Sequence, residues 1–578
     1  MPKSDLIIQA PREGTAQSPH TGFSEVRNLD VISNPGVAIM NNILAKVSAS
    51  TITGLPQWFV ADPTTPTSIW TVDNAGAVYK GTSSGGSWAA VTGNTHTFTV
   101  TIASPAVFSA TAHGFTTNDR VVFSTTGALP TGLSASTIYW IIATGLTADA
   151  FQVSTSKGGS AVNTSGSQSG THSFLTNGGG LAIWKDYLFA PRASSIDVYG
   201  PLSNSPSWTN NWKKIDTDSL WHPCLVSKND GKLYIGADRF VVSLDEATAP
   251  FVPATAASYT FTQQALDLPP NYRVKCLSEL GNNLMIGTWQ GTNYFDVRIG
   301  DIFPWDRSAV SFGQPIELAE YGIHGLLNIG NSLAVLAGIN GTIYRCDGSN
   351  AYIIGQVPNS VTSLVGSNKN LIFHPGAISY YKGRLFFGLS GEGTDAIAGM
   401  GVYSLLQTGK GNILTLEHII STENDGTSNV LKIGALLSVS RDILLVGWRD
   451  NTTYGVDKTT NTSFSYTTSY TKVYFDSPLY LVCTVFNPRS FTELELQLSK
   501  KLVTGEGIQV KYRNNLSDTF TAIKTPNGGT LSLDFTTLGA VISHRTIADI
   551  PSCEFLQMRV EMLGSSTTTP QFRSLTLR

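Results

Sequence analysis

Charged side chains are scarce in this 578-residue chain: Asp, Glu, Lys and Arg together make up 14%, and the net charge is −3. A groove that grips nucleic acid, or a surface that binds an anionic membrane, needs a concentrated excess of Lys and Arg. With 38 basic and 41 acidic residues, the chain has no such excess. The composition therefore argues against a protein whose main task is to hold DNA, RNA or a lipid headgroup layer.

Cysteine is also rare, and no CxxC pair occurs. The five cysteines are widely spaced: Cys224, Cys276, Cys346, Cys483 and Cys553. This spacing offers no zinc site, and the odd count leaves at least one thiol outside any disulfide. At least three lie in apolar, strand-like surroundings, where a free cysteine behaves as a small core residue. We predict no metal site.

Long apolar runs are missing as well. No stretch of eighteen apolar residues occurs, and the first residues, MPKSDLIIQAPREG, lack the apolar segment of a secretory signal. We therefore expect synthesis in a cytoplasm, with any export by another route. The chain also lacks an HExxH motif and any defensible order of Ser, His and Asp. We predict no catalytic residue and no cofactor.

Glycine, with 55 residues, and aromatic residues, at 10%, are plentiful, which is typical of β-structure with many turns. The clearest unit runs from Val274 to Val297. It contains three short apolar or β-branched segments, separated by turns at Gly281–Asn283 and Gln290–Thr292. Two turns flanked in this way predict an antiparallel meander.

One such unit cannot bury its own apolar face, so it needs neighbours of the same kind. The sequence contains them, because the same pattern recurs along the chain. Counted by the residue that closes each buried run, successive copies lie 46, 51, 49, 52 and 59 residues apart. The closing residues are Ala190, Gly236, Gly287, Leu336, Gly388 and Gly447. This period, with several short strands per copy, predicts an all-β chain built on a β-propeller of about seven blades. Six or eight blades also fit, and a string of unrelated meanders is the alternative.

Other segments depart from the period. The polar arm at the start has no core of its own, and the hairpin-like stretch that follows is expected to close the ring against the last blade. The final hundred residues alternate with period two, as in Thr492–Leu498, which predicts a β-sandwich that serves as a platform or oligomerisation domain. We divide the chain into an N-terminal arm and β-hairpin, a first blade, an inserted small β-barrel, the remaining blades and the C-terminal sandwich, over residues 1–50, 51–94, 95–175, 176–464 and 465–578.

Two segments resemble known modules. The turn within Val78–Trp88 resembles the Asp-box hairpin of sialidase-like propellers, with Gly85 and Trp88 in place but Ser83 at the Asp position. Residues 95–175 carry the ordered series TAHGF, NDRVVF, LPTGL, YWI, FQVS and SGTHSF. They resemble a β-barrel module of phage structural proteins that is related to the FCCH domain of ubiquitin-activating enzymes. Both resemblances imply β-structure. Removing residues 95–175 brings the first two blades close to the normal spacing, which predicts that this segment is an insertion in a blade loop.

The whole arrangement resembles the tail nozzle, or tail tubular, proteins of short-tailed bacteriophages. Stretches similar to phage tail sequences are GLAIWKDYLF, YGPLSNSPSWTNNW, ALDLPPNYRVKCLSELGNNLMIGT and DIFPWDRS. The resemblance implies a structural virion protein that forms a hexamer, docks to the portal-adaptor protein and meets tail fibre, spike or needle proteins. Genomic DNA would pass through the lumen without specific binding during ejection, in keeping with the near-neutral charge. The host outer surface is a further partner under this resemblance.

One stretch, DIFPWDRS, predicts a protein-contact loop. Phe303 and Trp305 form an apolar tip, flanked by Asp301, Asp306 and Arg307. An exposed Trp beside an Arg is typical of an interface hot spot.

Two other functions stay open at this point. Aromatic residues near inter-strand loops can stack on sugars, as in a receptor-binding tail protein that contacts a host glycan. They can also fill the wedges between blades or anchor a subunit interface. These residues are Trp208, Trp212, Trp221, Trp289 and Trp305. A propeller glycoside hydrolase would need carboxylates at the central opening. The candidates at blade turns are Asp73, Asp186, Asp238, Asp296, Asp306 and Asp442, with Arg239 and Arg449. Such residues more often cap turns.

Overall fold

The computed structural model is almost entirely β-structure. Its described part contains one short helix, α1 (Phe535–Leu538), and one 3-10 turn, η1 (Ala256–Ser258). No helix within these residues has the length and apolarity to cross a membrane. The described residues are 6–9, 25–27, 29–30, 37–41, 44–48, 51–84, 86–93, 96–111, 113–135, 137–174, 179–192, 195–215, 221–247, 250–290, 300–357, 371–391, 400–408, 411–418, 431–459, 473–482, 489–515, 518–564 and 568–578.

Seven four-stranded antiparallel units follow one another, built from residues 56 to 459 and one strand of the N-terminal segment. Such repeated meanders are the blades of a β-propeller. Blades 1 to 4 consist of β6 (Pro56–Ala61), β7 (Ser68–Asp73), β8 (Val78–Thr82) and β9 (Ala89–Ala90); β17 (Ala182–Trp184), β18 (Tyr187–Pro191), β19 (Ser195–Gly200) and β20 (Ser207–Lys214); β21 (Cys224–Val226), β22 (Leu233–Ala237), β23 (Phe240–Glu246) and β24 (Tyr259–Asp267); and β25 (Tyr272–Leu280), β26 (Asn283–Gln290), β27 (Gly300–Trp305) and β28 (Ile316–Leu318).

The last three blades complete the ring. Blades 5 to 7 consist of β29 (Ile323–Asn328), β30 (Leu333–Ala337), β31 (Thr342–Cys346) and β32 (Ala351–Gln356); β33 (Leu371–Tyr381), β34 (Arg384–Gly391), β35 (Gly401–Thr408) and β36 (Gly411–His418); and β37 (Lys432–Ser438), β38 (Leu444–Asp450), β39 (Thr453–Thr459) and β5 (Leu44–Lys46). Strand β5 comes from the N-terminal segment, with Lys46 opposite Asp457. The all-β propeller of seven blades is therefore confirmed, and an N-terminal strand closes its ring.

The repeat in the sequence has a packing cause. The second strand of a blade is covered on both faces by its neighbours, so β22 and β30 are buried at every position and consist of continuous small or apolar residues. The glycines that close these runs let the next blade approach. A Cβ at Gly236 would lie 2.6 Å from Val274 of blade 4, and one at Gly388 would lie 2.3 Å from Ile433 of blade 7. Where the run closes on glycine, as at Gly236 and Gly388, that glycine lies at the contact between neighbouring blades.

The inserted barrel lies between the last strand of blade 1 and the first strand of blade 2. Its sheet runs β14 (Ala150–Phe151), β11 (Phe108–Ser109), β10 (Thr97–Val100), β16 (His172–Phe174), β12 (Arg120–Thr125), β13 (Ile138–Ile141) and β15 (Val153–Ser154). Only Gln152 separates the two edge strands along the chain, so the sheet curls into a nearly closed barrel. Its core is a stack of phenylalanines, with the rings of Phe108 and Phe123 5.1 Å apart.

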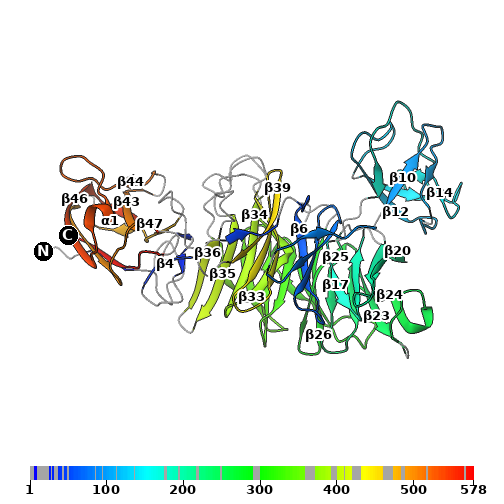
Figure 1. Cartoon of the computed structure of the whole chain (residues 1–578). Helices are drawn as coiled ribbons and strands as arrows, with labels where there is room; N and C mark the ends of the chain where they lie inside the picture. Colours follow the sequence, from blue (N-terminus) through cyan, green and yellow to red (C-terminus); the bar gives the residue numbers. More distant parts are fainter. Residues whose placement is uncertain are drawn as a thin grey trace.

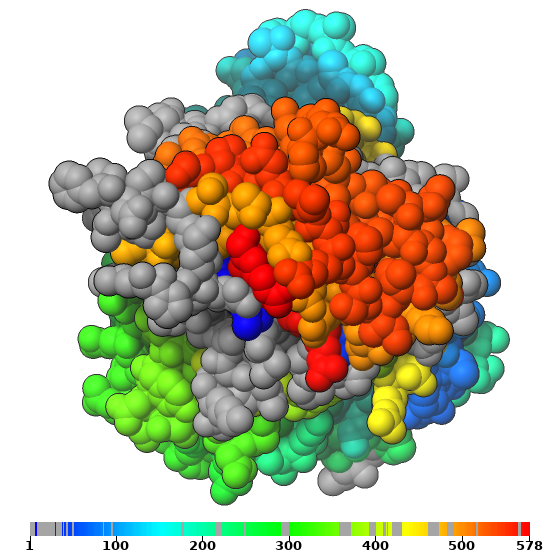
Figure 2. Space-filling model, turned by 90° about the vertical axis from the view of Figure 1, so that its left-hand side faces the viewer, coloured from blue at the N-terminus to red at the C-terminus, as the bar shows by residue number. Residues whose placement is uncertain are grey.

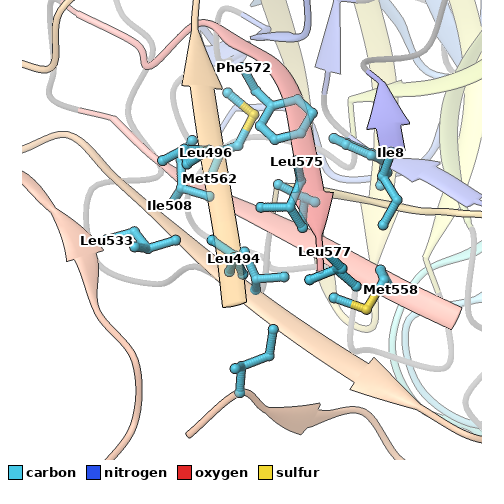
Figure 3. Packing of buried hydrophobic residues seen from close by; sticks show 14 of the residues in the cluster. Ile8, Leu494, Leu496, Ile508, Leu533, Met558, Met562, Phe572, Leu575 and Leu577 are labelled. Atoms are coloured by element: carbon cyan, nitrogen blue, oxygen red, sulfur yellow. The ribbon is translucent and has the colours of Figure 1, made fainter. Parts of the chain in front are cut away.

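The C-terminal domain is a sandwich of two sheets. One sheet runs β1 (Leu6–Gln9), β48 (Phe572–Leu577), β42 (Arg489–Leu498) and β46 (Ser543–Cys553); the other runs β44 (Thr521–Ala522), β43 (Gly507–Arg513), β47 (Phe555–Leu563), β40 (Tyr474–Asp476) and β2 (Glu25–Arg27). Leu494, Leu496 and Leu575 from the first sheet meet Ile508 and Met562 from the second (Figure 3). Period-two strands thus bury one face each, as the sequence predicts.

The N-terminal segment belongs to two domains at once. Strand β1 pairs along β48, with Ile8 buried in the sandwich core, so the polar arm shares the core of the C-terminal domain. Strand β2 lies between β40 of the sandwich and β36, the outermost strand of blade 6. Beside this junction, the buried carboxylate of Glu417 accepts hydrogen bonds from Arg384, Ser404 and Asn41. Figure 1 shows the resulting order: sandwich, propeller, and barrel beyond β20. Seen from the sandwich end, the barrel stands out from the rest of the molecule (Figure 2).

We expect Ile8→Ala to lower the free energy of unfolding of the sandwich by about 2–4 kcal/mol, because it removes buried methyl groups and leaves a cavity. Ile8 is 1% exposed, whereas its neighbour Ile7 is 52% exposed. Ile7→Ala is therefore the matched control and should change stability by less than about 0.5 kcal/mol. All eleven tryptophans precede residue 449, so indole fluorescence does not report the sandwich. Far-UV circular dichroism reports all β-structure, and the sandwich transition is the part of its change that fluorescence does not share. Equal effects of the two substitutions would contradict the placement of β1.

Candidate functional site

The predicted contact loop does not have an exposed aromatic tip. Phe303 and Trp305 lie in β27, and both are buried, as is Asp301. The indole N–H of Trp305 donates to the carbonyl of Ala309 at 2.8 Å, and the hydroxyl of Tyr272 donates to Asp301 at 2.6 Å. The prediction is wrong for these three residues, because the apolar run is the third strand of blade 4 and packs against its neighbours.

The charged end of the same stretch forms the turn after β27. The carboxylate of Asp306 accepts from the backbone N–H groups of Ser308 and Ala309, and these bonds hold the pKa of Asp306 below its ordinary value. Arg307 donates to Glu279 at 2.9 Å, and both side chains are mostly buried. This pair ties the turn after β27 to the end of β25, so Asp306 and Arg307 both have structural roles.

The acidic candidates for a hydrolase do not gather at one place. Asp186 and Asp442 lie at turns that join the first and second strands of blades 2 and 7, whereas Asp73 and Asp238 lie at turns that join the second and third strands of blades 1 and 3. In an antiparallel meander these two kinds of turn point to opposite ends of the blade. Asp73 caps its own turn by accepting from the backbone of Ala75. Asp296 lies outside the described residues.

The remaining candidates also have structural partners. Arg239 pairs with Asp267 at 3.0 Å, and Arg449 donates to the carbonyl of Asn451 at 2.7 Å. No group of three or more His, Cys, Asp or Glu side chains that could hold a metal forms within the described residues. Four cysteines are buried, as predicted for core positions: Cys224, Cys276, Cys346 and Cys553. Cys483 lies outside the described part of the chain.

The tryptophans singled out from the sequence pack within the propeller. Trp212 lies in the aromatic cluster between blades 2 and 3, where its indole N–H donates to the carbonyl of Pro253 at 2.9 Å. Trp208 packs on Tyr199, with ring centres 4.8 Å apart. The ammonium group of Lys275 contacts two indoles: it lies 5.1 Å from the ring centre of Trp221 and 4.9 Å from the ring centre of Trp289. Filling of the wedges between blades therefore accounts for the tryptophans that lie at blade contacts.

Basic and imidazole side chains meet on the inner strands of blades 4, 5 and 6. Burial lowers the pKa of Lys275 to about 7. Burial and, to a smaller extent, the nearby charge of Lys275 lower the pKa of His324 to about 3. Burial and the charges of Lys432 and Lys275 lower the pKa of His374 to about 3. Lys275 and His324 each occupy the bulged position of the first strand of its blade. These side chains form a buried, closely packed cluster in which the imidazoles are neutral.

The bore of the propeller is pinched at this level. A Cβ at Gly376 of blade 6 would lie 2.0 Å from the carbonyl oxygen of Gln57 in blade 1, and one at Gly434 of blade 7 would lie 2.1 Å from that of Pro56. Blades 1 and 6 are not neighbours in the ring, so their backbones meet across the bore. This close approach of the two backbones narrows the bore of the propeller.

The barrel is anchored to blade 2 by buried charge. The carboxylate of Asp197 accepts from His96 at 2.8 Å, from Arg192 at 2.8 Å and from the backbone N–H of Asn211 at 2.7 Å. Burial alone would raise the pKa of Asp197, but the hydrogen bond from His96 and the charge of Arg192 outweigh it and lower this pKa to about 2. Arg192 also donates to the carbonyl of Gly76 in blade 1. One carboxylate thus joins the barrel entry to two blades.

A cleft of about 560 Å³ lies where the barrel faces blades 2 and 3. The lining residues are Thr116, Thr117, Asn118, Asp119, Arg120, Trp140, Lys157, Lys214, Ile215, Asp238, Arg239, Phe240 and Gln263. Sequence reasoning missed Arg120 and Trp140 as candidates. The only signal was the alternation of the YWI segment, which turns Trp140 outward beside the buried Tyr139.

Comparison with known proteins gives propellers. No family model and no curated protein matches the chain. The Cps50 (Swd1) β-propeller domain of Myceliophteria thermophila is 9% identical over 72% of this chain and 99% of that chain, with a TM-score of 0.38. The WD40 repeats of RRP9 are 12% identical over 73% and 99%, with a TM-score of 0.36. An exo-beta-1,3-galactanase from Phanerochaete chrysosporium is 9% identical over 70% and 97%, with a TM-score of 0.27.

Proposed function

We propose that this chain is a structural virion protein of a tailed bacteriophage, a subunit of the ring-shaped tail nozzle. The observation that supports this most directly is the path of the N-terminal segment. It supplies a strand to the sandwich, a strand between the sandwich and blade 6, and the closing strand of blade 7. Backbone hydrogen bonds therefore join the sandwich and the propeller, which suits a stiff segment of a wall.

The pinched bore supports a channel that lies between copies of the chain. DNA would then run along the outside of each propeller and would be enclosed only when several copies form a ring. The composition has no excess of Lys and Arg over Asp and Glu, which suits a wall that conducts DNA without holding it. In this proposal the chain is not an enzyme, in keeping with acidic candidates that point to opposite ends of the blades.

The outer edge of the propeller offers a surface for contact between copies. Strand β32 ends the sheet of blade 5, and Tyr352 and Ile353 on it are 47% and 60% exposed. An edge strand with exposed apolar residues is prone to pair with another chain. We propose that the sandwich acts as the platform toward the portal-adaptor protein, and that fibre, spike or needle proteins bind elsewhere on the ring.

The proposal is tested by looking for the chain in purified phage particles. We expect mass spectrometry of purified particles to detect this chain, and electron cryomicroscopy to place six copies around the lumen at the end of the tail. Absence of the chain from particles would contradict the proposal. In solution, Ile353→Glu should reduce ring formation measured by mass photometry, because it places a charge at the proposed contact. Ile102→Glu is the control, since Ile102 is 47% exposed on the barrel.

A further inference from the structure

We propose that the cleft between the barrel and blades 2 and 3 binds an acidic saccharide, a sugar chain that carries carboxylate groups. This goes beyond the structural role above and does not depend on ring assembly. The volume of about 560 Å³ lies within the range of small-molecule sites, roughly 300–1,000 Å³. The walls combine cations, neutral hydrogen-bonding groups and aromatic rings, which together match the charge, hydroxyl groups and apolar ring faces of such a sugar.

The barrel wall carries a pre-organised cation. Arg120 and Trp140 are directly opposite each other in the β12–β13 pair, and the guanidinium lies 4.1 Å from the centre of the indole. The ammonium group of Lys157 lies 5.8 Å from the same ring. A guanidinium that is stacked on an aromatic ring keeps its planar fork of donors in one orientation, and a carboxylate accepts two bonds from such a fork.

The propeller wall is held by ion pairs. Lys214 bonds to Asp119 across the cleft, and Arg273 pairs with Asp238, whose side chain is mostly buried. These pairs hold both walls in place before a ligand arrives, so little conformational entropy is lost on binding. Among the lining side chains, cations outnumber carboxylates by four to two. The cleft therefore favours an anion while still offering carboxylate acceptors.

Those acceptors separate a saccharide from single-stranded nucleic acid. The carboxylates of Asp119 and Asp238 accept hydrogen bonds from sugar hydroxyls, but they repel a run of phosphates. Nucleic-acid grooves follow the backbone over several nucleotides with successive stacking rings. The lining here contains two aromatic residues, Trp140 and Phe240, within a compact space.

The test measures binding of sialyllactose, a tetragalacturonate and a hyaluronan tetrasaccharide to the full chain by calorimetry, with maltotetraose as the neutral probe and an eight-residue oligothymidylate as the nucleic-acid probe. We expect at least one acidic saccharide to bind and maltotetraose to bind at least tenfold more weakly. Arg120→Gln and Trp140→Ala should each weaken binding at least tenfold. Lys157→Glu, a charge reversal at an exposed loop position, should do the same without disturbing the fold.

The control is Arg513→Gln in the sandwich, where the guanidinium also stacks on an aromatic ring, 4.5 Å from the centre of Phe520. It should leave affinity unchanged. No binding of any acidic saccharide at 2 mM, equal binding of maltotetraose, or affinity that Lys157→Glu leaves intact would overturn the proposal. Tighter binding of the oligothymidylate would overturn it in favour of nucleic acid.

Discussion

Replacing Lys275 by Met is expected to stabilise the propeller by about 2–4 kcal/mol at pH 6. Lys275 is 3% exposed, and burial lowers its pKa from 10.5 to about 7. A shift of that size corresponds to roughly 4–5 kcal/mol, and the two indole faces beside the ammonium group offset part of it. Methionine has a similar length and no charge, so it keeps the packing and removes the cost of burying a cation.

The pH dependence of the free energy of unfolding follows from the lowered pKa of Lys275. Between pH 7 and 10.5 the unfolded chain binds a proton at Lys275 that the folded chain does not, so the stability of the wild type rises with pH. The Met variant lacks this slope, and the two proteins should converge near pH 10.5. Urea unfolding followed by indole fluorescence measures this. Lys228→Met, at an exposed position, is the control and should change stability by less than about 0.5 kcal/mol. A Met variant that is less stable than the wild type at pH 6 would contradict the argument.

The propeller could be predicted from the sequence because its cause is local and repeated. Each blade needs a doubly buried second strand, and most blades end it on a small residue where the next blade approaches, which leaves a mark every 46 to 59 residues. The alternation in the sandwich strands is equally local. The pairing of Ile8 with Leu575 is different, since it joins residues at opposite ends of the chain and leaves no periodic mark.

The functional residues were harder to predict for the same reason. In DIFPWDRS an apolar run is followed by charged residues. This pattern is equally compatible with an exposed loop and with a strand that ends in a turn, and only the packing of neighbouring strands around β27 distinguishes the two. The cleft requires the register that sets Arg120 opposite Trp140 and the docking of the barrel on blade 2. Neither is encoded within a short window of sequence.

Removing the carboxylate of Asp197 is expected to cost about 3–5 kcal/mol, the usual loss when one partner of a buried ion pair is deleted. In Asp197→Ala the guanidinium of Arg192, 3% exposed, loses its buried partner, and His96 loses its acceptor. The side chain of Asp197 itself is fully buried. Because the carboxylate joins the barrel entry to blades 1 and 2, we expect the loss in the transition that indole fluorescence reports, with the sandwich transition unchanged in circular dichroism.

Acid should act on the wild type through the same group. The folded-state pKa of Asp197 is about 2, below its ordinary value of 3.8, so its stabilising effect is complete above pH 4 and is lost as the pH falls toward 2. A shift of this size is worth about 2–3 kcal/mol. Asp267→Asn is the matched control, because Asp267 also pairs with an arginine but is 52% exposed, and a surface pair contributes at most about 1 kcal/mol. If the two substitutions cost the same at pH 7, and the Ala variant loses stability below pH 4 as steeply as the wild type, then this carboxylate does not anchor the barrel.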